Sequence, residues 1–270
     1  MGEGVVNPGL EWLDRSRAYG RKIRGLWSKV RQRRYAADID VHPDTWADLD
    51  GLDWKGPYRK TFRFDGALID HHHRAIHDAP GGRYGIGCAL DLGIDGYLQQ
   101  GDALKMYELA RLTEGDALEL GTHYGLSASI IASALAERDG AHLETVDLNA
   151  RTTTVAAVNL MGRPGSDRVV FTVRDGAARM DELAAEGRRY SYIFVDHWHG
   201  YQATLDAANQ LHRLLEPGGF VQFHDFVDSQ NADGEHFYGV FQAVLDSVCL
   251  DGRFLFCGNY GCTGVFRFLH

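Results

Sequence analysis

Short apolar runs alternate with segments of helical periodicity from about residue 93 onward. The apolar runs have the length of strands that are buried on both faces, as in a parallel sheet. Strands are therefore predicted at 117–120, 142–148, 169–174, 190–195 and 220–223. Helices are predicted at 99–113, 127–138, 150–161, 177–186 and 202–215. This alternation is typical of an α/β fold with helices on both faces of the sheet.

The segment 99–113 has the pattern of an amphipathic helix. Its apolar face is predicted to contain Ala103, Met106, Tyr107 and Ala110. The opposite face, which is predicted to meet solvent, contains Lys105, Glu108 and Arg111.

The C-terminal part of the pattern adds a helix at 235–248 and two apolar strands at 253–258 and 263–269. The residues between these strands, Asn259-Tyr-Gly-Cys262, have the composition of a hairpin turn. The complete prediction is a Rossmann-like, seven-stranded, mostly parallel sheet with a reversed last strand. We expect this domain to span 99–270 and to be preceded by an N-terminal extension.

The first 36 residues form a basic arm with apolar residues at helical spacing. They contain nine basic residues against three acidic ones, so the arm carries +6 and the rest of the chain −15 of the total of −9. One interpretation is a helix that seeks an anionic membrane surface or an acidic partner. We favour a helix docked on the protein's own acidic body or on a second subunit, because Gly20 and Gly25 weaken an isolated helix. Self-association into a homo-oligomer is therefore expected.

Residues 37–98 are predicted to be a lid or an acceptor-pocket region. A strand is expected at 58–65, and Gly81, Gly82, Gly85 and Gly87 indicate a loop. Asp70 precedes a histidine cluster at 71–73 and 77. These side chains are candidate metal ligands, but we favour a polar surface or a lid over a pocket.

Charge, cysteine content and hydropathy narrow the classes of function. The net charge of −9 argues against general nucleic-acid binding. No apolar run approaches the roughly 20 residues needed to span a bilayer, and a signal-peptide core is absent, so a cytoplasmic location is expected. The four cysteines have no metal-type spacing and are predicted to be structural thiols: Cys88, Cys249, Cys257 and Cys262.

A glycine-rich turn follows the first predicted strand and leads into a helix. Glu119 lies within this strand, and Gly121 and Gly125 lie in the turn. Glycines allow close backbone approach, and the start of a helix offers unpaired N–H groups, so the turn is suited to a nucleotide-like ligand. The spacing differs from the Gly-x-Gly-x-x-Gly of dinucleotide folds.

Polar residues also follow the other predicted strands, where a parallel sheet binds its ligand. Asp147 closes the second strand and is suited to accept two hydrogen bonds from vicinal ribose hydroxyls. The later strands are followed by Asp175-Gly176, by Asp196-His-Trp-His199 and by His224-Asp225. Each aspartate alone is also a candidate helix cap. Their joint placement at consecutive strand ends instead favours one ligand site.

These motifs resemble those of class I S-adenosylmethionine-dependent methyltransferases over residues 93–226. Leu118-Glu-Leu-Gly-Thr-His-Tyr-Gly-Leu-Ser-Ala128 and Ile193-Phe-Val-Asp-His-Trp-His199 are similar to segments of catechol O-methyltransferases. Leu214-Leu-Glu-Pro-Gly-Gly-Phe-Val-Gln-Phe-His-Asp225 and Asp196-x-x-His199-x-Tyr201 resemble a bacterial group that includes macrocin-type sugar O-methyltransferases and cephalosporin-hydroxylase-like proteins.

The resemblance implies roles for individual residues. Glu119, Gly121 and Gly125 would line the methionine part of S-adenosylmethionine, Asp147 would hold the ribose, and Asp175 with Gly176 would lie near the adenine. His197 and Trp198 would form a wall beside the adenine or the transferred methyl group. The implied cofactor-binding set is Glu119, Gly121, Thr122, Gly125, Ser127, Asp147, Leu148, Asp175, Gly176, Asp196, His197 and Trp198.

The resemblance also implies a divalent metal at Asp196, His224 and Asp225. His224 stands where a hard cation would prefer an oxygen ligand, so a set that also includes His199 suits manganese, iron or zinc at least as well as magnesium. An acceptor hydroxyl must lose its proton to become a good nucleophile. His199, at the position of the family's lysine, is the candidate base and acts beside Asp196.

The expected function is methyl transfer from S-adenosylmethionine to a sugar or phenolic hydroxyl of a small molecule, with assistance from the metal. The alternatives are a non-methylating, hydroxylase-like metal-dependent relative and a non-catalytic module that binds the cofactor or a glycan. A binding module has no need of Asp196, His199 and Asp225.

Overall fold

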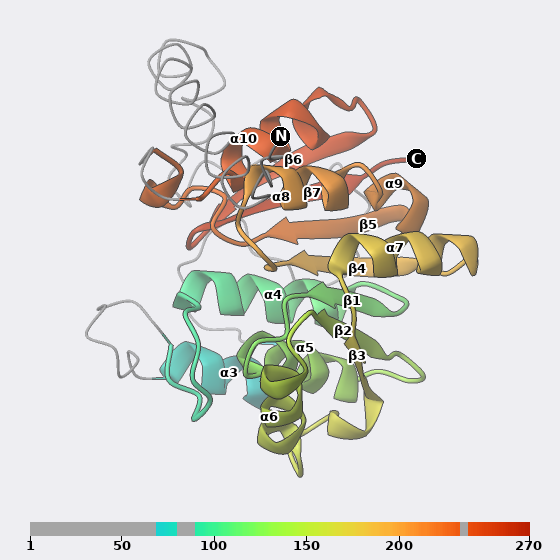
Figure 1. Ribbon diagram of the computed structural model, residues 1–270. Helices are drawn as coiled ribbons and strands as arrows, with labels where there is room; N and C mark the ends of the chain where they lie inside the picture. The colour runs from blue at the N-terminus through green and yellow to red at the C-terminus, as the bar shows by residue number, and fades with distance from the viewer. Residues whose placement is uncertain (1–68, 80–89, 233–236) are drawn as a thin grey trace, which may run out of the picture.

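The computed structural model describes residues 69–79, 90–232 and 237–270 (Figure 1). The predictions for the basic arm, the strand at 58–65, the glycines at 81–87 and Cys88 lie outside these residues. No helix in the described ranges is long and apolar enough to cross a membrane.

Seven strands form one sheet in the order β3-β2-β1-β4-β5-β7-β6. The first five strands pair in parallel, whereas β7 is antiparallel to both of its neighbours. The strands are β1 Ala117–Leu120, β2 Leu143–Asp147, β3 Val169–Val173, β4 Tyr190–Val195, β5 Leu215–Phe223, β6 Phe254–Tyr260 and β7 Thr263–Phe268. The predicted seven-stranded sheet with a reversed last strand is confirmed.

Helices cover both faces of the sheet, as predicted (Figure 1). One apolar core lies between the sheet and α3 to α6, and a second core lies between the sheet and α7 to α10. The helices of the first face are α3 His71–Asp78, α4 Gln100–Leu112, α5 Leu126–Ala136 and α6 Ala150–Leu160. Those of the second face are α7 Gly176–Ala185, α8 Tyr201–Ala208, α9 Leu211–Leu214 and α10 Val240–Asp246.

The helix predicted at 202–215 is wrong as a single element. It ends at Ala208, resumes as the short α9, and gives way to β5 at Leu215. Pro217 explains the second boundary, because a proline cannot continue a helix and biases the residue before it toward extended backbone. The register of β4 against β5 shifts between Tyr190, which pairs with Leu215, and Tyr192, which pairs with Phe220. The extra residues at this point therefore belong to β5.

The predicted solvent-facing side of α4 is wrong for Lys105 and Glu108. Both side chains are buried: Glu108 lies against His73 of α3, and the Lys105 ammonium lies 4.3 Å from the centre of the Tyr260 ring on β6. Lys105 donates a hydrogen bond to Glu108, and His73 Nε2 lies 3.4 Å from Glu108 Oε1. Burying a charge is costly unless it is paired, so the pairing explains how this helix tolerates charges inside the protein.

Candidate functional site

The turn after β1 brings the backbone of two strand ends into contact. Gly121 has φ +103°, and a Cβ atom there would lie 2.0 Å from the carbonyl oxygen of Asp196 at the end of β4. Only glycine permits both this conformation and this approach. Gly125, with φ +88°, caps α5 without a side-chain hydrogen bond, so the N-terminus of α5 keeps its donors for a ligand.

Glu119 is completely buried beneath this turn. Its Oε2 accepts a hydrogen bond of 2.5 Å from Thr145 Oγ1, and Thr145 also pairs with Thr122. Burial raises the pKa of Glu119 to about 8, although hydrogen bonds from Ser127 and Thr145 partly oppose this. Its Oε1 has no hydrogen-bond partner. The expected contact with a cofactor stays a prediction, and in this structure Glu119 supports the turn from below.

Asp147 and Leu148 lie at the end of β2, beside the same turn. Asp147 Oδ2 accepts a hydrogen bond of 2.8 Å from the His123 amide, which links the end of β2 to the turn after β1. The Leu148 side chain is 74% exposed. A large apolar side chain exposed next to a carboxylate suits a flat ring and a polar sugar bound side by side.

Asp175 serves as a helix cap. Its Oδ1 accepts a hydrogen bond of 3.0 Å from the Ala178 amide at the start of α7. The alternative prediction of a helix cap is therefore confirmed for Asp175. A Cβ at Gly176 would lie 3.0 Å from His197 Cδ2, which places His197 directly over this helix start. Burial lowers the pKa of His197 although Asp196 opposes this, which favours an uncharged ring.

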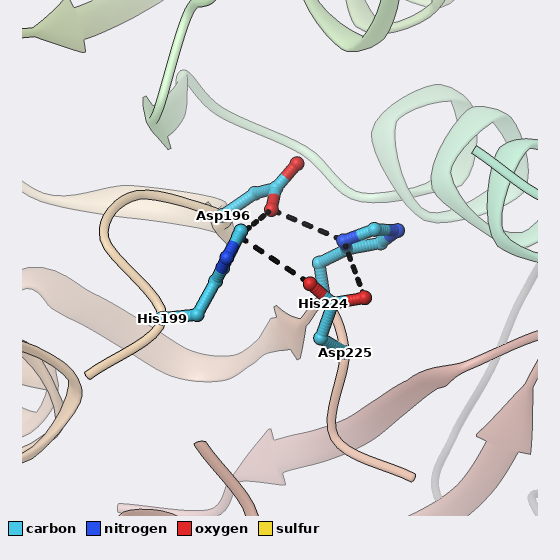
Figure 2. Close-up of side chains that lie close together, drawn as sticks. All are labelled: Asp196, His199, His224 and Asp225. Carbon is cyan, nitrogen blue, oxygen red and sulfur yellow. Dashed lines mark hydrogen bonds and ion pairs between the residues drawn. The ribbon is translucent and has the colours of Figure 1, made fainter. Parts of the chain in front are cut away.

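Four side chains that follow β4 and β5 form one cluster (Figure 2). His199 Nε2 lies 3.3 Å from Asp196 Oδ1 and 3.3 Å from Asp225 Oδ2. His224 Nδ1 lies 3.1 Å from Asp196 Oδ1 and 3.3 Å from Asp225 Oδ1. The two aspartates and the two histidines therefore alternate around a common centre. The structure thus brings together the set predicted from the sequence.

The charges of this cluster depend on one another. Burial raises the pKa of Asp196, but His224 and His199 lower it more strongly, leaving it well below its usual range. Burial lowers the pKa of His224 and of His199, yet the carboxylates beside them leave both pKa values raised. Without a cation, the carboxylates beside them thus favour the protonated form of both imidazoles.

The donor set fits a divalent cation. His224 is 5% exposed, and its Nδ1 has no hydrogen-bond partner although two carboxylate oxygens lie nearby. Such an orphaned buried nitrogen is costly unless a ligand satisfies it. Asp225 has φ +54°, an uncommon conformation for a residue with a side chain, and such strain is concentrated at functional sites. Two nitrogens and two carboxylates suit manganese, iron or zinc as well as magnesium.

Two aromatic rings that the sequence did not indicate, Phe237 and Tyr238, lie beside the predicted Trp198 and His199. The ring centroids of Trp198 and Phe237 are 6.2 Å apart, and those of His199 and Tyr238 are 4.7 Å apart. Trp198 is 59% exposed and Phe237 is 49% exposed. The Gly239 amide donates a hydrogen bond of 2.8 Å to the His199 carbonyl, which fastens the two segments together. This contact joins residues from separate loops, so no local pattern could have found it.

Within the described ranges, the histidines of α3 belong to no ligand set. Among the described residues, the groups with metal-ligand spacing are the four-residue cluster and Asp102, His224 and Cys262. His72 Nε2 lies 3.5 Å from Glu137 Oε1, His77 Nδ1 lies 2.7 Å from Asp78 Oδ1, and His73 is buried against Glu108. The favoured interpretation of these histidines as a polar surface is therefore wrong for His73.

Asp102 and Cys262 are functional candidates that the sequence did not single out. Cys262 Sγ lies 3.4 Å from His224 Nε2 and 3.6 Å from Asp225 Oδ1. Burial and the nearby Asp102 carboxylate raise the pKa of Cys262 to about 12. In the part of the chain that the structure describes, Cys257 and Cys262 are free thiols.

The sheet order and the polar residues beyond the ends of β1, β2, β4 and β5 agree with the predicted Rossmann-like fold. Residues 118–226 match the family model described as a methyltransferase domain. This match confirms the resemblance that the strand-end motifs indicate. No curated protein sequence matches the chain.

Solved structures with the same fold include O-methyltransferases. One is TomG from Streptomyces achromogenes, involved in tomaymycin synthesis and solved in complex with S-adenosylmethionine; the match has 18% identity and a TM-score of 0.51 and covers 64% of this chain and 82% of TomG. Another is the O-methyltransferase from Bacillus cereus in complex with S-adenosylhomocysteine, with 18% identity, a TM-score of 0.51 and coverage of 76% of this chain and 94% of that one. At these identities the likeness establishes the fold.

Proposed function

We propose that this protein transfers a methyl group from S-adenosylmethionine to a hydroxyl of a small molecule, with a divalent cation at the strand-end cluster. The observation that carries the proposal is the orphaned, buried Nδ1 of His224, which faces Asp196 and Asp225 beside the turn after β1. The match of residues 118–226 to a methyltransferase domain and the shared fold with O-methyltransferases support the same reaction.

The cofactor is assigned to the turn after β1 and the end of β2. Asp147 accepts hydrogen bonds from vicinal ribose hydroxyls, and the exposed Leu148 provides an apolar contact for the adenine. The uncapped N-terminus of α5, beginning at Leu126, offers backbone donors to the carboxylate of the methionine part. S-adenosylmethionine supplies an electrophilic methyl group on a sulfonium.

The acceptor is assigned to the region between the cluster and the aromatic rings. Asp196, His224 and Asp225 would hold the cation, which would lower the pKa of an acceptor hydroxyl. His199 receives the hydroxyl proton at Nε2, the oxygen forms its bond to the methyl carbon, and the carbon–sulfur bond breaks. Trp198 and Phe237 provide a flat apolar surface that suits the ring of a phenol or the apolar face of a sugar.

Calorimetry with S-adenosylmethionine tests the cofactor assignment. The parent protein should bind it, and Asp147→Asn should weaken binding by about 10- to 100-fold if one charge-assisted hydrogen bond to the ribose is worth 1.5–3 kcal/mol. Asp181→Ala is a matched control, because Asp181 is an exposed aspartate on α7 that pairs with Arg213. The absence of binding by the parent protein would remove the methyltransferase proposal.

Turnover measurements test the second half of the proposal, methyl transfer to a hydroxyl with the assistance of a cation. A panel of phenols and sugars should be methylated in the presence of Mn²⁺, and S-adenosylhomocysteine should appear in proportion to product. Chelation should abolish turnover and leave cofactor binding intact. Full activity after chelation would contradict the role of the cation. Product formation without S-adenosylmethionine would instead favour the hydroxylase-like alternative.

A further inference from the structure

Polar side chains face both ring nitrogens of His224. Its Nδ1 faces the carboxylates of the cluster, whereas its Nε2 faces Asp102 and Cys262. Asp102 Oδ2 lies 3.7 Å from His224 Nε2, and Cys262 Sγ lies 3.4 Å from the same nitrogen. Asp102 belongs to the first turn of α4, and Cys262 belongs to the turn between β6 and β7. These two elements lie outside the strand ends that supply the cluster.

Backbone amides fix the carboxylate of Asp102 in place. Oδ1 accepts hydrogen bonds of 2.8 Å from the Cys262 amide and 3.1 Å from the Thr263 amide. Oδ2 accepts one of 2.8 Å from the Gln99 amide. Asp102 is fully buried, and a Cβ at Gly261 would lie 2.3 Å from its Oδ1. The carboxylate therefore cannot move away from His224.

Asp102, His224 and Cys262 also have the mutual spacing of metal ligands. A second cation at this place is disfavoured, because all three amides above already donate to the oxygens of Asp102. A cation would have to displace backbone hydrogen bonds inside the protein, and each such loss is expensive. The group is thus better suited to act on His224 than to bind an ion of its own.

We propose that Asp102 is a positioning residue for the cation site, and that Cys262 supports the same ring nitrogen of His224. A carboxylate facing Nε2 favours the tautomer that carries its hydrogen there, which leaves the lone pair of Nδ1 directed at Asp196 and Asp225. A histidine ligand is commonly held in this way through its other ring nitrogen. This inference rests on the proposed cation site at Asp196, His224 and Asp225.

Titration with Mn²⁺ alone, followed by calorimetry, tests the inference. Asp102→Asn should weaken Mn²⁺ binding by about 10- to 100-fold, the usual effect of losing such a supporting carboxylate. Its affinity for S-adenosylmethionine should equal that of the parent. The visible absorption of bound Co²⁺ should also change, since it reports the ligand geometry directly.

Two further variants separate positioning from simple damage to the fold. Thr263→Val is the matched control: it perturbs the same turn by removing the hydrogen bonds from Thr263 Oγ1 to Tyr260 and from Gln222 Nε2 to Thr263, yet it does not touch His224. It should leave Mn²⁺ affinity unchanged. Cys262→Ala retains the amides that hold Asp102 but removes the thiol beside both His224 Nε2 and Asp225 Oδ1. It should weaken Mn²⁺ binding by a few-fold, so an unchanged affinity provides a test even if Asp102→Asn does not fold.

The outcomes are distinct. Unchanged Mn²⁺ affinity in folded Asp102→Asn, or in Cys262→Ala when Asp102→Asn does not fold, would overturn the inference. An equal loss in Thr263→Val would also overturn it, because the effect would then come from the turn. If the parent protein does not bind Mn²⁺, the proposed cation site itself fails and the positioning role fails with it. The titration of the parent distinguishes this result from the other two.

Discussion

His199 Nε2 lies equally far from two carboxylates, 3.3 Å from Asp225 Oδ2 and 3.3 Å from Asp196 Oδ1. These acids follow two different strands, so the imidazole spans the space between the ends of β4 and β5. In the absence of a cation both carboxylates raise its pKa, although burial opposes them. A cation that takes up the charge of the carboxylates removes this effect. His199 then becomes able to accept a proton at neutral pH.

The first prediction concerns His199 as a base. His199→Ala should lower kcat by about 10²- to 10⁴-fold at saturating Mn²⁺ and S-adenosylmethionine, the usual contribution of a general base. The affinity for Mn²⁺ should change little. A large loss of Mn²⁺ affinity would instead make His199 a fourth ligand, and an unchanged rate would remove it from the mechanism.

The second prediction concerns pH and stability in EDTA. His199 and His224 have raised pKa values in the folded protein. Their stabilising contribution is therefore complete below about 6.5, the unfolded value, and is lost as the pH rises through the folded values. The Tm of the cation-free protein should fall as the pH increases above about 6.5. Mn²⁺ should restore the Tm most strongly at high pH, because it competes with protons for the same nitrogens.

The carboxylate of Asp196 affects the stability in a different pH range and with the opposite sign. Its pKa is lowered in the folded protein, so its stabilising contribution is present above its usual pKa of 3.8 and is lost as the pH falls toward the folded value. A Tm in EDTA that stays constant from pH 6.5 upward would contradict the assignment of two protonated imidazoles to the cluster.

The third prediction concerns Glu119. Its pKa rises from 4.5 to about 8 on folding. The stability linked to this group is present below 4.5 and is lost as the pH rises through about 8. Glu119→Gln retains the shape and removes the titration, so its Tm should decline less than that of the parent between pH 5 and 8. Identical pH profiles would show that Glu119 is not buried as a neutral acid.

The fourth prediction concerns Gly121. Gly121→Ala should destabilise the protein by about 3 kcal/mol or more and abolish cofactor binding, because positive φ and a backbone clash act together. Gly140→Ala is the matched control: Gly140 has φ +70°, but its Cβ would meet nothing within 4 Å. It should cost only about 1–2 kcal/mol, the strain of the left-handed backbone alone. Equal losses in chemical denaturation would contradict the importance of the contact with Asp196.

The sequence predicted the parallel part of the fold well because buried strands have a strong local signal. The strands at 117–120 and 190–195 were predicted with the observed bounds. The boundary at Leu215 was missed because an apolar residue fits the end of a helix and the start of a strand equally well. Only Pro217, two residues later, distinguishes them.

The cluster was predictable because the ends of parallel strands meet at one edge, so residues that follow β4 and β5 must lie near one another. Asp102 was not predictable in this way. It contacts Cys262, 160 residues later in the chain, and nothing in the periodicity of α4 distinguishes it from an ordinary aspartate in the first turn of a helix. The burial of Lys105 and Glu108 differs from the prediction for a related reason, since helical periodicity does not reveal that α3 and β6 pack on the polar face.

The position of β7 in the sheet has a consequence for synthesis. This strand follows β6 in the sequence but is inserted between β5 and β6. While a ribosome produces the chain, the cofactor half of the site, built by β1 and β2, can therefore assemble well before the half that contains His224. Until β7 arrives, β5 presents an unpaired apolar edge and Asp102 lacks two of its amide donors. The nascent protein thus passes through a stage that is prone to aggregation, and we expect chaperones to engage it there.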